Sequence, residues 1–147
     1  MIRKIKFLLP ALTISTLALD MLTKKIAVAY FEQPLRIIGD FVRFVYSENY
    51  GIAFSIPLKG PLLIAGNLII LALIVIMGSR YLELNQRLNS VAFALIIGGA
   101  LGNIFDRITQ GYVIDFIAIY KYPVFNIADV ALTVGAIILA AQLIKNK

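Results

Sequence analysis

Residues 60–79, GPLLIAGNLIILALIVIMGS, decide the fold class of this chain, because they form twenty consecutive residues without a charged side chain. A helix of about 20 apolar residues is long enough to cross the hydrocarbon core of a bilayer. The whole chain has the same character, since 61% of its 147 residues are hydrophobic and its mean hydropathy is +0.90. An ordinary soluble domain is less apolar than this, so the sequence predicts a membrane protein.

Three further uncharged stretches, at 7–19, 88–105 and 130–144, are shorter than this span. Each reaches spanning length only if a neighbouring aspartate lies inside one end of its helix, near the membrane interface. The aspartates in question are Asp20, Asp106 and Asp129. We therefore predict an all-α membrane protein, a single domain over residues 1–147, with four transmembrane helices at 5–27, 60–79, 88–107 and 126–145.

The distribution of lysine and arginine predicts how these helices are oriented. Seven of the fourteen fall within the seventeen residues of 1–6, 80–87 and 145–147, so positive charge is denser there than in the two long connections. By the positive-inside rule, both termini and the 80–87 loop are cytoplasmic. The net charge of +6 is then an orientation signal, and no nucleic-acid partner is expected. The opposite, outer side is then predicted to carry four acids: Asp20, Asp106, Asp115 and Asp129.

The basic start followed by an apolar stretch also fits a secretory signal peptide. No small-x-small cleavage site precedes Asp20, however, and the helical pattern continues to Phe31. We therefore expect this segment to stay in the protein as its first membrane helix.

The two long connections are expected to form the outer surface. Residues 32–59 carry β-branched and aromatic residues around a Gly-Asp turn at 39–40, which predicts a short β-hairpin between the first two helices. Residues 108–125 are too apolar for a free loop and too short to cross the membrane. We expect them to form a short peripheral segment at the interface, with three tyrosines at headgroup level, namely Tyr112, Tyr120 and Tyr122.

The chain contains no cysteine and no histidine. The absence of cysteine excludes a disulfide framework, a thiol nucleophile and a cysteine metal site. The absence of histidine removes the usual catalytic base and the usual zinc ligand. Carboxylates are the remaining general acids and bases, and we expect neither a metal nor a cofactor.

Several polar residues have helical spacings that structure alone can explain. Asp20 and Lys24 are four residues apart and form a possible ion pair on one helix face. Asn103 and Asp106 are three apart, with Arg107 adjacent, and can tie helices together by hydrogen bonds. Two further patterns also have structural explanations: Gly98 and Gly102 have the spacing of closely packed helices, and in NIAD at 126–129 Asn126 can cap a helix that has Asp129 in its first turn.

Asp115 is not explained in this way, because it lies in an apolar segment with no neighbouring cation until Lys121. If its carboxyl meets that of Asp129, both cannot ionise at once, and the two share a proton. The ionised member can then activate water for attack on a peptide carbonyl, while the protonated member polarises that carbonyl and protonates the leaving nitrogen. A purely structural set of interfacial acids remains the alternative.

Four motifs add a resemblance to a known family. LDMLTKK (19–25), NYGIAFS (49–55), GGALGNIFDRITQGYVIDF (98–116) and FNIADVALTVG (125–135) together resemble the bacterial lipoprotein signal peptidases, the type II signal peptidases. They occur in that family's order and, with the four spans, cover nearly the whole chain. The resemblance implies a metal-independent aspartic endopeptidase of the inner membrane that acts on diacylglyceryl-modified prolipoproteins and cuts before the lipidated cysteine. It implies Asp115 and Asp129 as the catalytic dyad. We expect the enzyme to be a monomer.

Supporting residues follow from the same resemblance, one motif at a time. The GNxxDR block, whose polar groups line the site and bind the substrate backbone, is matched by Asn103, Asp106 and Arg107. The asparagine beside the second catalytic acid, the NxGxAF block that cradles substrate and the first-helix DQxxK pattern are matched by Asn126, by Asn49 and Gly51, and by Asp20 and Lys24. The substrate's acyl chains are expected to stay in membrane lipid.

The chain departs from the family pattern at three points. Met21 stands where glutamine is usual, and Ile52 replaces the commoner alanine or valine. Only thirteen residues separate Asp115 from Asp129, so the peripheral helix over the site should be short.

Two other classes of protein fit part of the pattern. A small transport or ion-conducting subunit would distribute its acids along a path through the bilayer. Here the span 60–79 has no charge, and the membrane-proximal acids are predicted at one surface. A structural assembly subunit would tolerate the loss of Asp115 and Asp129, whereas a peptidase would not.

Overall fold

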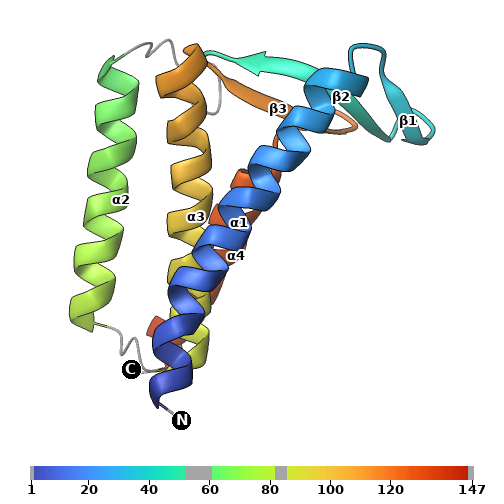
Figure 1. Ribbon diagram of the computed structural model, residues 1–147. Coiled ribbons are helices and arrows are strands. Elements are labelled where there is room, and N and C mark those ends of the chain that lie inside the picture. The colour runs from blue at the N-terminus through green and yellow to red at the C-terminus, as the bar shows by residue number, and fades with distance from the viewer. Residues whose placement is uncertain (1, 52–60, 82–85, 146–147) are drawn as a thin grey trace.

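The computed structural model describes residues 2–51, 61–81 and 86–145, and in these it contains four helices and three strands. In chain order these are α1 (Ile2–Tyr30), β1 (Leu35–Ile38), β2 (Val42–Asn49), α2 (Pro61–Tyr81), α3 (Arg87–Gln110), β3 (Val113–Ile119) and α4 (Ile127–Lys145) (Figure 1). The four predicted helices are present, and α1 and α3 extend beyond their predicted ends. The fold is mostly helical with one small antiparallel sheet.

Within the described residues, three of the four helices are long and apolar enough to cross a membrane: α1 over Phe7–Tyr30, α3 and α4. In α2 the apolar stretch is Leu63–Ile76. Large apolar side chains cover the outside of the helices, and Leu22, Ile69 and Ile137 are each more than half exposed. Such surfaces are costly in water and natural in lipid, as expected for a membrane-embedded chain.

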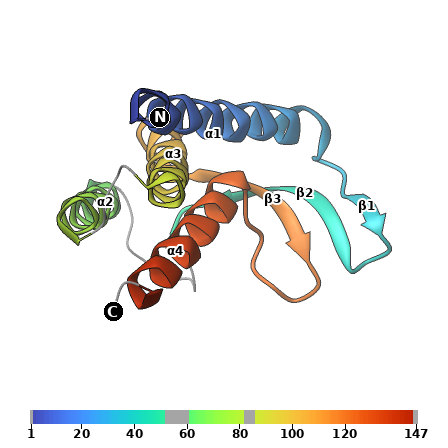
Figure 2. The same ribbon diagram turned by 90° about the horizontal axis from the view of Figure 1, so that it is seen from below.

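Helix α3 is the centre of the bundle. It packs against α1, α2 and α4, and most of its apolar span is buried, whereas only a small part of α1 and α4 is (Figure 2). Glycines make this close packing possible: a Cβ at Gly98 would overlap Thr16 of α1, and a Cβ at Gly99 would overlap the backbone of Ala128 in α4. The close helix approach predicted from the spacing of Gly98 and Gly102 is confirmed, since Gly102 also faces α1.

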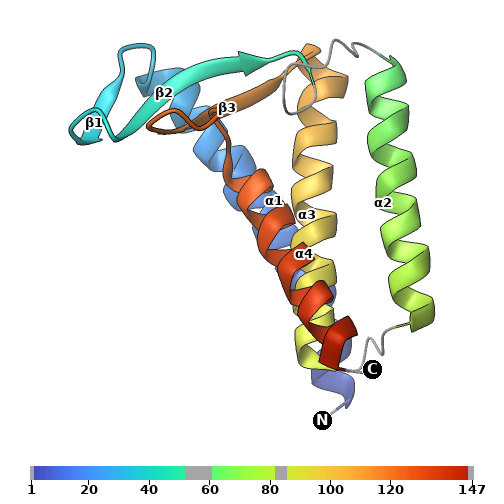
Figure 3. The same ribbon diagram turned by 180° about the vertical axis from the view of Figure 1, so that it is seen from behind.

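The sheet lies at the end of the bundle where α1 and α3 finish and α4 begins (Figures 1 and 3). Its strand order is β1-β2-β3, with both pairs antiparallel. The hairpin predicted in residues 32–59 is confirmed as β1 and β2, joined at Gly39, which has a positive φ of 52°. The part of that prediction over 52–59 lies outside the described residues.

The short peripheral segment predicted for residues 108–125 contains strand β3, which pairs with β2 over Val42–Asn49. The short helix expected between Asp115 and Asp129 was wrong, because the residues after Asp115 continue this strand and then turn toward the start of α4. A strand satisfies the backbone of this apolar segment through the ladder with β2, and Phe125 closes back on Ile117. Packing against α1 also holds the strand, because Ile114 and Phe116 form a buried cluster with Ala27 of α1.

Candidate active site

Asp115 lies in the middle of β3, with its side chain turned into the protein and only 2% of the residue exposed. The β2–β3 pairing brings Asn49 close, and the Asn49 amide Nδ2 donates to Asp115 Oδ2 over 2.9 Å. From the other side the Asn126 Nδ2 donates to Asp115 Oδ1 over 2.7 Å. Both oxygens of the Asp115 carboxyl therefore accept a hydrogen bond from a carboxamide.

Asp129 lies in the first turn of α4, and its position follows from how that helix begins. Asn126 Oδ1 accepts from the backbone N–H of Asp129 at 2.9 Å, and Asp129 Oδ2 accepts from the backbone N–H of Asn126 at 3.3 Å. This reciprocal cap satisfies two backbone donors at the helix start and confirms Asn126 as the predicted N-cap. The other oxygen, Asp129 Oδ1, accepts from Asn103 Nδ2 at 2.8 Å.

Asn126 joins the two acids directly. Its side chain donates to Asp115, while its backbone and side chain fix Asp129. The same Nδ2 also donates to Asn103 Oδ1 at 3.1 Å and to the Ile114 carbonyl at 3.2 Å. One buried asparagine thus holds two carboxyls that are fourteen positions apart in the chain.

A buried ionic cluster supports the asparagines from α1. Lys24 Nζ lies 2.7 Å from Asp20 Oδ2 and 2.8 Å from Asp106 Oδ2, which confirms the predicted Asp20–Lys24 pair. The same ammonium donates to Asn103 Oδ1 over 3.1 Å. Asp106 of α3 shares this cation with Asp20, a contact between two helices that spacing within one helix could not predict.

Arg107 connects the helices to the end of β2. Its Nη1 donates to the Asn103 carbonyl and its Nη2 to the Gly51 carbonyl, each at 3.3 Å. The backbone N–H of Gly51 in turn donates to Asn49 Oδ1 at 3.1 Å. The structure therefore brings every residue predicted for the site into one polar network: Asp20, Lys24, Asn49, Gly51, Asn103, Asp106, Arg107, Asp115, Asn126 and Asp129.

Burial dominates the electrostatics of Asp115. The pKa of Asp115 is raised from its ordinary value of 3.8 to about 7, chiefly because the carboxyl is buried. The Asn49 hydrogen bond lowers this pKa, the negative charge of Asp129 raises it, and Lys24 and Asn126 lower it. At neutral pH Asp115 can therefore hold a proton that an exposed aspartate would have lost.

Asp129 lines three cavities. The first, of about 320 Å³, lies between β3 and α4 and is lined by Asn49, Arg107 and Asp129, with the turn after β3 forming one side. A second, of about 190 Å³, lies between α2, α3 and α4, and a third, of about 240 Å³, lies along the start of α4. Asp129 can therefore be reached from cavities that border apolar helix surfaces.

Sequence reasoning missed several residues that line these cavities. Leu132 and Thr133 lie on the same face of α4 as Asp129, three and four residues further along, and this spacing was a usable signal. Asn67 lines the cavity beside α2, and its Nδ2 has no hydrogen-bond partner among the described residues. Nothing in the sequence indicates that α2 turns this carboxamide toward Asp129. Among the described residues, no three acidic side chains are grouped so that they could hold a metal ion.

Comparison with known proteins gives a consistent result. Residues 12–145 match the family model described as signal peptidase (SPase) II. The chain is 39% identical to the lipoprotein signal peptidase of Moorella thermoacetica, over 94% of this chain and 92% of that protein. It is 41% identical to that of Caldicellulosiruptor bescii, over 90% and 87%. A bacterial membrane enzyme solved by the in meso method at 2.3 Å resolution superposes with a TM-score of 0.77 at 28% identity, covering 94% of this chain and 88% of that one.

Proposed function

The chain belongs to the lipoprotein signal peptidase (signal peptidase II) family, membrane proteases that process prolipoproteins, and we propose that it works as an aspartic endopeptidase with Asp115 and Asp129 as its dyad. One observation carries the proposal. Asn126 holds both carboxyls at once, one through its side chain and the other through its helix cap. A purely structural aspartate at either position would not need this shared anchor.

The chemistry follows from the protonation of the pair. Asp129, ionised, takes a proton from a water molecule while the water oxygen attacks the scissile carbonyl carbon. Asp115, protonated, donates to the carbonyl oxygen and so stabilises the charge that develops there. As the tetrahedral intermediate collapses and the C–N bond breaks, the proton held by Asp129 passes to the leaving nitrogen. The products are a free carboxyl end and a free amino end.

We assign the residues around the dyad to binding the peptide part of the prolipoprotein, and not its lipid part. The Arg107 guanidinium lines the cavity together with Asn49, and the Gly51 backbone is hydrogen-bonded to both residues, so a peptide backbone can be bound there in extended form. Lipid chains are best left in the bilayer, because each methylene withdrawn from water contributes about 0.8 kcal/mol. The proposed bond cleaved is the one preceding the diacylglyceryl cysteine.

The proposal includes the setting of the enzyme. It lies in the bacterial inner membrane with both termini cytoplasmic and acts as a monomer, with the dyad near the outer face. The density of lysine and arginine in residues 1–6, 80–87 and 145–147 supports this orientation. The transport alternative is not favoured, given the family to which the chain belongs.

The test uses purified protein in detergent and a diacylglyceryl-modified prolipoprotein, with cleavage followed by gel shift. Asp115→Asn and Asp129→Asn keep the bulk of each side chain and remove the acid, so each should lower kcat by at least about 10³-fold. Asp40→Asn is the matched control, because Asp40 is an exposed acid on the hairpin turn and lies outside the network. Undiminished cleavage by either dyad variant refutes the assignment.

A second measurement on the same protein tests the proposed independence of metal. Activity should be unchanged by EDTA and by thiol reagents, since the chemistry is assigned to carboxylates and the chain has no cysteine. Loss of activity with EDTA and its recovery on adding a divalent metal would assign the reaction to a metal site instead.

A further inference from the structure

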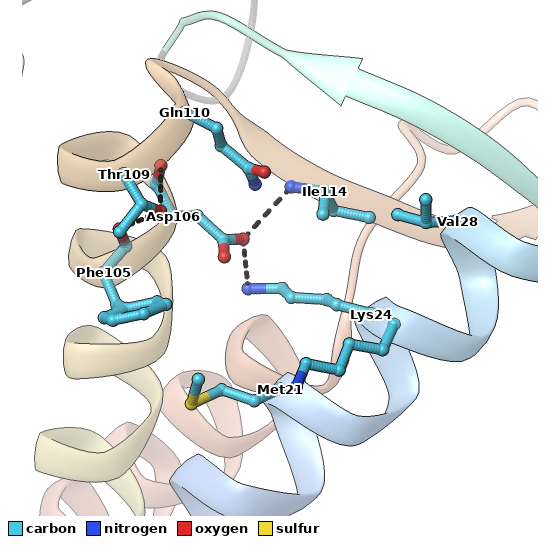
Figure 4. A pocket seen from close by; sticks show the side chains of 9 residues that line it. Met21, Lys24, Val28, Phe105, Asp106, Thr109, Gln110 and Ile114 are labelled. Atoms are coloured by element: carbon cyan, nitrogen blue, oxygen red, sulfur yellow. Dashed lines mark hydrogen bonds and ion pairs between the residues drawn. The ribbon is translucent and has the colours of Figure 1, made fainter.

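Lys24 occupies a position that the proposed reaction does not yet use. Only 2% of this residue is exposed, although it carries a full charge among membrane helices. Its ammonium has three N–H donors, and three acceptors surround it: Asp20 Oδ2 at 2.7 Å, Asp106 Oδ2 at 2.8 Å and Asn103 Oδ1 at 3.1 Å. Figure 4 shows the side chain reaching from α1 to Asp106 on α3. Every donor is committed, and none is left to contact Asp115 or Asp129 directly.

Two of the three acceptors around Lys24 also accept a hydrogen bond from the backbone next to the dyad. Asp20, held by Lys24 through Oδ2, uses Oδ1 to accept from the N–H of Ala128 at 2.9 Å, one residue before Asp129. Asp106, held by the same ammonium, accepts from the N–H of Ile114 at 3.2 Å, one residue before Asp115 (Figure 4). One cation thus connects the backbone of α4 to that of β3 at the two positions that carry the acids.

The third acceptor, Asn103 Oδ1, belongs to an amide whose orientation is fixed by its contact with Lys24. Asn103 Oδ1 accepts from Lys24 and from Asn126 Nδ2, so the oxygen must face these donors and the NH₂ must face Asp129. A carboxamide turned over would place its NH₂ against the ammonium, which has no acceptor to offer. In the observed direction, the oxygen of Asp129 nearest Asn103 can only accept a hydrogen bond. Lys24 thus determines which end of the Asn103 amide meets Asp129.

We infer that Lys24 is the positioning residue of the dyad: through Asp20 and Asp106 it sets where the two acids lie, and through Asn103 it turns an N–H donor toward Asp129. This inference rests on the proposed function. The charged groups around the ammonium and the dyad are Asp20 on α1, Asp106 and Arg107 on α3, Asp115 on β3 and Asp129 on α4, and the described part of α2 beside the site, Leu63–Ile76, carries no charge. The raised pKa of Asp115 assigns the shared proton of the pair to Asp115.

The experiment compares Lys24→Met with Lys25→Met, which removes the neighbouring, exposed lysine of the same helix. Both are purified in detergent, and kcat, KM and the pH profile are measured with the diacylglyceryl prolipoprotein. Lys24→Met should lower kcat about 100-fold and leave KM within about threefold, because Arg107 and Gly51 still bind the peptide. The basic limb of the pH profile should move up, because the positive charge of Lys24 lowers the pKa of Asp115 and Lys24→Met removes that charge. Lys25→Met should match the parent in all three.

A double-mutant cycle tests whether Lys24 acts through Asn103. In an Asn103→Ala background, Lys24→Met should lower kcat by a smaller factor than in the parent, because the amide that Lys24 orients is gone. Equal factors in both backgrounds would overturn the role assigned to Asn103. Folded Lys24→Met protein with the kcat and pH profile of the parent would overturn the whole inference.

Stability is followed by thermal melting, since Lys24→Met leaves two buried carboxylates without their cation. Should it not fold, Lys24→Met combined with Asp106→Asn removes one of these charges and is measured in the same way. If both fail to fold, Lys24 is a structural residue and the positioning role falls. Failure of the proposed function is recognised separately, because the parent protein itself would then leave the prolipoprotein uncut.

Discussion

At the scale of single residues, the site is built on the fixed directions of three carboxamides. Each amide oxygen accepts from a group that can only donate: Asn49 from Gly51 N–H, Asn126 from Asp129 N–H, and Asn103 from Lys24. Each NH₂ group is thereby turned toward a carboxyl of the dyad. Asparagine at these positions supplies donors without adding charge, which suits a site at the edge of hydrocarbon.

The first prediction concerns pH. The pKa of Asp115 is raised to about 7, so its carboxyl keeps its proton below that pH and loses it as the pH rises through it. The proposed acid role needs the proton, so kcat/KM should fall about tenfold per pH unit above about pH 7, with apparent pKa values that belong to the coupled pair. Rates measured from about pH 4 to 9 check this, and a flat profile up to pH 9 contradicts it. In Asn49→Ala the basic limb should move upward, because the Asn49 hydrogen bond lowers the pKa of Asp115.

The second prediction concerns Gly102, whose absent side chain leaves room for the Asp20 carboxylate. A Cβ at this position would overlap Asp20 Oδ2. Gly102→Ala should therefore displace Asp20 from Lys24 and Ala128, lower the melting temperature by several degrees and lower activity at least about tenfold. Gly66→Ala in α2 is the control, because no atom lies within 4 Å of its added Cβ. Equal melting temperatures for the two variants would contradict the argument.

At the scale of elements, hydropathy predicted the helices and could not predict β3. Runs of uncharged residues near spanning length identify α2, α3 and α4 with little ambiguity, and the NIAD cap locates the start of α4. VIDFIAI, in contrast, is a short apolar run that periodicity cannot assign to helix or strand. Its pairing partner, β2, is far away in the sequence, and the Ser47–Asp115 register cannot be seen without it.

The third prediction tests how the sheet supports Asp115. Phe116 is buried beside Asp115 in the chain and packs against Phe31 and Phe44, with ring centroids 6.3 Å away in each case. Phe116→Ala should cost about 3–5 kcal/mol of stability through the cavity it leaves, and lower activity with it. Ile38→Ala is the control, because Ile38 is an exposed residue on β1. Thermal melting compares the two, and equal losses would show that β3 is not held by this cluster.

At the scale of the whole molecule, the motifs named the ten site residues and the fold explains why they meet. The ends of α1 and α3, the start of α4 and the sheet all lie at one end of the bundle (Figures 1 and 3). What the sequence could not supply are the contacts between distant segments: Lys24 shared by two acids, Asn126 shared by the dyad, and Asn67 of α2 beside Asp129. These depend on helix packing around α3, for which a single chain carries only the glycine spacing as a signal.

The fourth prediction tests the orientation in the membrane, and the cysteine-free chain makes it simple to test. Lys121→Cys places a thiol on the exposed turn after β3, and Lys145→Cys places one at the exposed end of α4. In spheroplasts, a membrane-impermeant maleimide should label Lys121→Cys readily and Lys145→Cys only after lysis. The parent protein supplies the unlabelled control. The reverse pattern would invert the proposed topology.

The open edge of the sheet has a consequence for molecules crowded in the plane of a membrane. Strand β1 is four residues long, all four are exposed, and its register with β2 shifts between Arg36 and Ile38. A longer, flatter border would be a template on which strands of neighbouring copies could add one after another. Edge strand β1 is short and irregular and carries the charged side chain of Arg36, so strands of neighbouring molecules should pair with it poorly.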